Sequence, residues 1–158
     1  MQQALLSSNA MARQVTVSVR LPCSVEVAYS EWLSVVWLNG GGLGKPTIKE
    51  KGTETGVGCV RVVGAGVTEE ILSAQKPNRI EYTVRSGPFP VSQHRGVVNF
   101  KAVETETTEV TWICDFVPST LGRVFLCCGA GLDIVIRLSF KRMLSVLEAK
   151  VTRAKARM

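Results

Sequence analysis

The chain has 158 residues but only one histidine, His94, and none of its cysteines are spaced as CxxC. Without a cluster of cysteine and histidine the sequence contains no recognisable zinc site. The glycine-rich run from Asn39 to Gly44 lacks the preceding strand and the following GKS or GKT of a phosphate-binding loop. We interpret this run as a flexible loop, and we expect neither a metal nor a cofactor.

Aromatic residues make up only 6% of the chain, and they are not interleaved with basic residues as on a base-stacking surface. The net charge is +6, and much of the excess lies in the last 20 residues. Cations at the C-terminal end of a helix oppose the negative end of its dipole. This basic segment therefore reads as a solvated helix end, and a nucleic-acid partner is not expected.

The sequence also lacks a long hydrophobic run. The N-terminal segment has no basic start and no apolar core of a secretory signal. The longest apolar stretch, Leu121 to Ile136, is short for a membrane span and contains two charged residues. Four of the five cysteines lie in apolar runs, which is typical of reduced, buried thiols. We expect an intracellular, cytoplasmic protein with a flexible leader over residues 1–13 and one domain over residues 14–158.

What is present is a series of strands. Apolar and polar residues alternate from Val15 to Leu21, and Ser24 is placed to cap a helix after Pro22. Six further strands are predicted at Thr47 to Lys51, Gly58 to Val63, Val67 to Gln75, Arg79 to Arg85, Val91 to Val103 and Glu109 to Val117. Because short turns separate them, the sheet is predicted to be antiparallel.

A long amphipathic helix is predicted to end the chain. Its apolar stripe steps by three or four residues through Ile136, Phe140, Leu144, Leu147 and Val151. Burying this stripe against the sheet would contribute about 10 kcal/mol before entropy. A sheet that curls around one helix leaves space beside it, so we expect a pocket lined mainly by apolar groups.

Three stretches in this order resemble the START, Bet v 1 and polyketide-cyclase superfamily. They are VTVSVRLPCSVEVAYSEW, GVGCVRVVGAGVTEEILSAQKPNRIEYTV and VTWICDFVPSTLGRVF with the helix that follows. The resemblance covers residues 14–155 and is greatest to the polyketide cyclase/dehydrase-like subgroup. It implies an α+β helix-grip fold: a curved antiparallel sheet of about seven strands around a long C-terminal helix, with one or two short helices after the first strand. It also implies binding of small hydrophobic molecules, without a shared catalytic signature.

Alternation along the strands predicts which side chains face the pocket. Among the residues of the inner faces, the aromatic candidates are Trp112 and Phe100, and the polar candidates are Tyr82, His94 and Ser92. The helix stripe contributes the further candidate Phe140. His94 could act as a general base, but no serine or cysteine stands at the spacing of a nucleophile. A satisfied histidine at the rim is the alternative.

Arg61 interrupts the apolar run GCVRVV, and two orientations are open. Because Val60 and Val62 form the more apolar face, Arg61 could point to solvent. Pointing inward, it would need a partner, and Glu69 or Glu70 on the next strand could provide one. The GCVR stretch is similar to one in plant lachrymatory-factor synthases, whose arginine works in the pocket, and this favours the inward orientation.

Two functional hypotheses follow. The first is a binding or transport module for a hydrophobic small molecule such as a lipid, isoprenoid or polyketide. The second is a cyclase, dehydratase or isomerase that transfers protons through Arg61 with Glu69 or Glu70, or through His94 with Tyr82. Transient docking on an acidic membrane through the basic helix end and the glycine loop is a further expectation.

Overall fold

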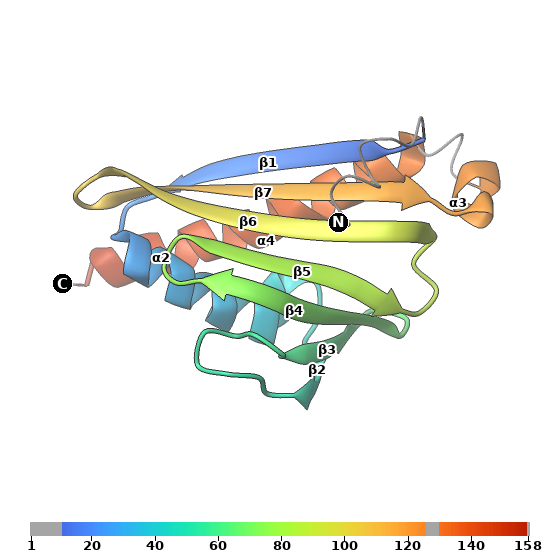
Figure 1. Ribbon diagram of the computed structural model, residues 1–158. Coiled ribbons are helices and arrows are strands. Elements are labelled where there is room, and N and C mark those ends of the chain that lie inside the picture. Colours follow the sequence, from blue (N-terminus) through green and yellow to red (C-terminus); the bar gives the residue numbers. More distant parts are fainter. Residues whose placement is uncertain (1–10, 126–129, 158) are drawn as a thin grey trace.

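A computed structural model describes residues 11–125 and 130–157 (Figure 1). Most of the predicted leader, residues 1–10, lies outside the described residues. The same is true of Cys127 and Cys128, so the expectation of reduced, buried thiols stays a prediction for these two residues.

Seven antiparallel strands form one curved sheet in the order β1-β7-β6-β5-β4-β3-β2 (Figure 1). The first strand thus pairs with the last, and β1 and β2 form the two edges of the sheet. All seven predicted strands are present, and their boundaries differ by up to two residues from the predicted ones. The strands are β1 (Arg13–Leu21), β2 (Thr47–Glu50), β3 (Val60–Val63), β4 (Val67–Gln75), β5 (Arg79–Ser86), β6 (Val91–Glu104) and β7 (Thr107–Pro118).

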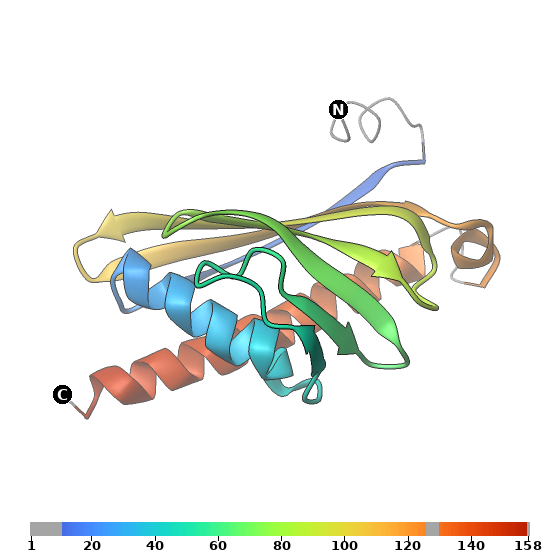
Figure 2. The ribbon, with the colours of Figure 1, turned by 60° about the horizontal axis from the view of Figure 1, so that its bottom comes forward.

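Two helical segments cover the same face of the sheet (Figure 2). The first comprises α2 (Val25–Glu31), which continues directly into the π-helix η1 (Trp32–Leu38). The predicted cap is confirmed, because the Ser24 side chain accepts a hydrogen bond from the Val27 amide. The second is α4 (Ala130–Lys155), which follows the short α3 (Thr120–Phe125). None of the helices in the described ranges is long and apolar enough to cross a membrane.

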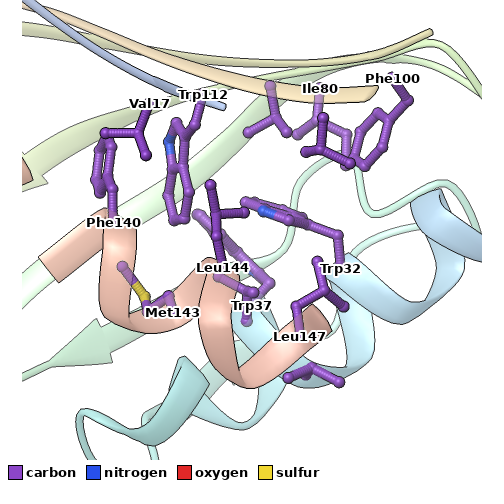
Figure 3. Close-up of a cluster of buried hydrophobic side chains, with 14 of the residues drawn as sticks. Val17, Trp32, Trp37, Ile80, Phe100, Trp112, Phe140, Met143, Leu144 and Leu147 are labelled. Carbon is purple, nitrogen blue, oxygen red and sulfur yellow. The ribbon is translucent and has the colours of Figure 1, made fainter. Parts of the chain in front are cut away.

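The core lies between the sheet and these helices (Figure 3). All five residues of the predicted apolar stripe on α4 are buried, which confirms the helix face read from the sequence. The Phe140 ring stacks on Trp112 of β7 with centroids 3.9 Å apart, and Trp32 meets the Trp112 ring edge-on at 5.3 Å. Stacked and edge-to-face aromatic pairs of this kind stabilise a core beyond the area that they bury.

The glycine run after η1 is more closely packed than the predicted flexible loop. It forms one short turn, η2 (Gly40–Gly42), in which Gly40 and Gly41 are buried. Gly41 has a positive φ of 55°, and a Cβ at this position would collide with the Met143 side chain of α4. The absence of side chains thus lets the backbone approach α4 closely, which the sequence alone did not reveal.

Candidate ligand-binding cavity

A cavity of about 240 Å³ lies between the sheet and the first half of α4, beside η2. Its volume is that of roughly eight molecules of liquid water. Its wall consists of Gly40, Leu43, Gly44, Arg61, Val63, Gly64, Val67, Glu69, Tyr82, Val84, Phe89, His94, Cys114, Val135, Ile136, Ser139, Phe140 and Met143. Most of these side chains are apolar. Leu43 and Val135 are each about half exposed, and they mark the rim where the cavity meets solvent.

Arg61 is the buried charge of this wall. Its side chain is only 4% exposed, and Nε donates to Glu69 Oε2 at 2.7 Å. Nη1 donates to the carbonyl oxygens of Val36 at 2.8 Å and Trp37 at 2.7 Å. The guanidinium carbon also lies 3.9 Å from the centre of the Trp37 ring. The inward orientation is therefore the correct one, and Glu69 is its partner.

The local structure explains how a charge is tolerated here. Arg61 and Glu69 face each other directly in the pairing of β3 with β4. Val36 and Trp37 lie in the last turn of η1, where carbonyl groups carry the negative end of the helix dipole. The guanidinium thus gains a carboxylate, two carbonyl oxygens and an aromatic face, which together replace the water that it loses on burial.

His94 is held neutral in the wall. Its Nδ1 accepts a hydrogen bond from the Val84 amide at 3.2 Å, so the proton of the neutral ring resides on Nε2. Nε2 lies 3.4 Å from Cys114 Sγ. Burial lowers the pKa of His94 from 6.5 to about 4. Because its only lone pair already accepts from the backbone, His94 has no free site at which to act as a general base.

Tyr82 also has a defined partner. Its hydroxyl accepts a hydrogen bond from Trp112 Nε1 at 2.9 Å, and the side chain is almost fully buried. Burial raises the pKa of Tyr82 well above 10. The ring lies against Gly96 on the neighbouring strand, where any Cβ would overlap the ring carbons. Because its pKa is raised, the hydroxyl stays protonated, and it keeps its own hydrogen to donate while its oxygen accepts from Trp112.

Cys114, the thiol on the cavity wall, is not set up as a nucleophile. Burial, with smaller contributions from nearby carboxylates, raises the pKa of Cys114 far above that of a free thiol. The expectation of buried, unpaired thiols is confirmed for Cys23, Cys59 and Cys114. The reactive form of a thiol is the thiolate, so covalent catalysis by Cys114 is disfavoured.

The structure brings together Arg61, Tyr82, His94 and Phe140 of the predicted site residues, since all four line the cavity. Trp112 and Phe100 instead belong to the solid core: Trp112 backs onto Phe140, and Phe100 packs against Tyr29 and Trp32. Both are large inner-face aromatics, and alternation alone does not distinguish a cavity wall from a filled core.

Two predicted polar candidates lie elsewhere. Glu70 follows Glu69 on β4 and therefore points to the opposite face of the sheet, where Arg85 Nε lies 3.3 Å from its carboxylate. Ser92 is exposed because the pairing of β6 with β7 shifts between Val91 and Gln93, and this bulge interrupts the alternation. Neither residue reaches the cavity.

The wall also contains residues that the sequence analysis missed. Leu43, Val135 and Met143 line the cavity, although the first lies in a presumed loop and the second off the helix stripe. Val135 immediately precedes Ile136 of the stripe, so its place on the flank of α4 is a signal that could have identified it. No local pattern marks Leu43, because its position depends on how η2 packs against α4.

Comparisons with known proteins agree with this geometry. The family model described as "Polyketide cyclase / dehydrase and lipid transport" matches residues 9–152. A protein from Nitrosospira multiformis has a similar structure, with a TM-score of 0.70 and 18% identity over 92% of this chain and 100% of that one. A point mutant of norcoclaurine synthase from Thalictrum flavum, in complex with a transition-state analogue, has a TM-score of 0.68 and 9% identity, covering 91% of this chain and 96% of its own.

A third similar structure is that of Ara h 8.0201, with a TM-score of 0.64 and 12% identity over 90% of this chain and 99% of that one. No curated protein sequence matches the chain. A curved antiparallel sheet closed over a long C-terminal helix, with a mainly apolar cavity between them, defines a helix-grip protein with a fold that binds hydrophobic ligands. The chain belongs to the polyketide cyclase/dehydrase and lipid transport family, within the START and Bet v 1-like superfamily.

Proposed function

We propose that this protein binds a small hydrophobic molecule of the lipid, isoprenoid or polyketide kind in the cavity under the sheet, and releases it chemically unchanged. The observation that supports this function is the character of the wall. It is mostly apolar, and its histidine and cysteine are already engaged with protein partners. His94 and Cys114 offer neither a free base nor a thiolate, so binding is favoured over chemistry.

The size of the cavity restricts the ligand. At about 240 Å³ it lies below the range of about 300–1,000 Å³ that is usual for drug-sized ligands. A compact molecule of one or two rings, or a short chain, fits this volume, whereas a lipid with two acyl chains does not. Transport in this proposal therefore concerns small cargo.

Native mass spectrometry of the purified protein, followed by extraction into organic solvent, tests this function. We expect a discrete mass increment that disappears on extraction and yields a hydrophobic compound. A protein that carries no compound and takes up none from a panel of small aromatic and terpenoid molecules would contradict the proposal. Val135→Trp, which narrows the cavity from the half-exposed rim of α4, should reduce uptake while leaving the fold intact by circular dichroism.

One observation favours an enzyme as the second candidate. The Glu69 carboxylate lines the cavity beside Arg61, and a carboxylate in an apolar site can move a proton in a cyclase, dehydratase or isomerase. Glu69→Gln would then abolish turnover of an identified ligand without abolishing its binding. Equal turnover by the wild type and this variant would exclude the candidate.

The rim of the cavity supports transient contact with an acidic membrane as part of the proposal. Ile134, Val135 and Leu138 on α4 are more than half exposed, and Val135 also lines the cavity. One helical turn further along, Lys141 and Arg142 are exposed. Apolar side chains beside cations are suited to an anionic bilayer. In a flotation assay the protein should float with phosphatidylglycerol vesicles at low salt and separate from them at high salt. Failure to float with the vesicles at low salt would refute this contact.

A further inference from the structure

The Arg61–Glu69 pair is incompletely satisfied by the protein on its cavity side. Nε and Nη1 of Arg61 use their hydrogens on Glu69 and on two carbonyl oxygens of η1. Nη2 has no hydrogen-bond partner among the described residues. It is not one of the buried atoms without a partner, so it is accessible to solvent. Since the side chain is only 4% exposed and lines the cavity, this remaining donor faces the cavity.

Glu69 presents the complementary group. Its Oε2 accepts from Arg61 Nε, whereas its Oε1 makes no hydrogen bond to the described residues. The Glu69 side chain is 12% exposed and lines the cavity. Its Oε1 is not a buried atom without a hydrogen-bond partner, so it is accessible to solvent. The Arg61–Glu69 ion pair therefore offers both a free donor and a free acceptor in a mainly apolar wall. Their charges cancel, because one guanidinium stands against one carboxylate.

This arrangement discriminates between ligands by charge. A carboxylate ligand would be attracted by Arg61 but repelled by Glu69 at a similar distance, so its loss of hydration would not be offset. An ammonium ligand would be attracted by Glu69 but repelled by Arg61, so its loss of hydration would not be offset either. A ketone or ether accepts from Nη2 but leaves Glu69 Oε1 without a donor. A hydroxyl group can accept from Nη2 and donate to Oε1 at once.

We propose that the ligand of this cavity carries a neutral hydroxyl group, as an alcohol, phenol or enol, that the Arg61–Glu69 pair binds through one donated and one accepted hydrogen bond. The inference rests on the proposed function, since it specifies the polar end of the hydrophobic ligand. The rest of the molecule then lies along the apolar wall formed by residues such as Val84, Phe89 and Phe140. The pair acts as a selectivity device that rejects fatty acids and other anionic amphiphiles.

A matched series of probes on one ring system tests the inference. Naphthalene, 2-naphthol, 2-naphthoate and 2-naphthylmethylamine have similar size and can be titrated into the protein by calorimetry. We expect 2-naphthol to bind about tenfold more tightly than each of the other three, because only it completes both hydrogen bonds. Binding of 2-naphthoate as tightly as 2-naphthol would overturn the inference. Equal binding of naphthalene and 2-naphthol would overturn it while leaving the proposed function intact, and binding of none would overturn both.

A charge variant adds a second test with a control on the same strand. Glu69→Gln keeps the shape of the side chain but leaves the Arg61 charge unbalanced, so the preference should change from 2-naphthol to 2-naphthoate. Glu70→Gln makes the same change in net charge on the opposite face, where Glu70 lies against Arg85, and should leave the preference unchanged. An unchanged preference in Glu69→Gln would overturn the inference, as would an equal change in both variants. Thermal unfolding shows whether each variant is folded. The probe series on the wild-type protein tests the inference even if a variant does not fold.

Discussion

His94 makes the stability of the fold depend on pH in a defined window. Its pKa is about 4 in the folded protein and about 6.5 in an unfolded chain, because burial disfavours the imidazolium. Between these two values the unfolded state binds a proton that the folded state does not. The contribution of His94 to stability is therefore fully present above pH 6.5 and is lost as the pH falls toward 4.

The size of the effect follows from the two pKa values. At pH 5 nearly all unfolded chains carry the proton on this imidazole, but only about a tenth of the folded molecules do. Acidification from pH 7 to 5 should therefore lower the free energy of unfolding by about 2 kcal/mol. In model peptides, carboxylic acids titrate mainly below this window. For Glu81, burial raises the pKa, but hydrogen bonds from Arg79 and Arg95 outweigh it and lower the pKa below its ordinary value.

Urea unfolding, followed by tryptophan fluorescence at pH 7 and pH 5, measures this loss. In His94→Asn the side-chain oxygen can accept from the Val84 amide in place of Nδ1 but cannot take up a proton, so the pH dependence should largely disappear. Because His94 is the only histidine of the chain, its ring resonances can be followed directly by NMR. A native imidazole that titrates near pH 6.5, or equal losses in wild type and variant, would refute the reasoning and show that water reaches the ring.

Three further predictions concern stability. Arg61→Met leaves Glu69 without its partner and should cost about 3–5 kcal/mol in urea unfolding, whereas adding Glu69→Met should recover most of this loss; a double variant no more stable than the single one would contradict the pairing. Gly96→Ala forces the Tyr82 ring to move and should cost about 1–3 kcal/mol; an unchanged melting temperature would show that the ring has room. Tyr82→Phe leaves Trp112 Nε1 without an acceptor and should cost about 1–3 kcal/mol in chemical denaturation, and full stability would indicate a replacement acceptor such as water.

Arg61 shows the limit of predicting the buried face of a strand from the alternation of apolar residues. Val60 on the opposite face is as buried as Arg61, at 4% exposure each, so the apolar character of one face did not exclude burial of the other. The sequence identified the need for a carboxylate partner, and Glu69 meets it. It did not identify the carbonyl oxygens of Val36 and Trp37, which lie 25 and 24 residues earlier in the chain.

The strands, the capped first helix and the stripe of α4 were determined by the sequence alone, because burial of a repeating face leaves a local pattern of apolar residues. Only the tertiary structure decided the cavity and its polar end. The volume depends on how closely Gly41 lets η2 approach α4, the neutral state of His94 depends on its burial, and its tautomer depends on one amide of the neighbouring strand. Such properties arise where separate elements meet, and each element's own sequence records the face that it buries but not the partner that it meets there.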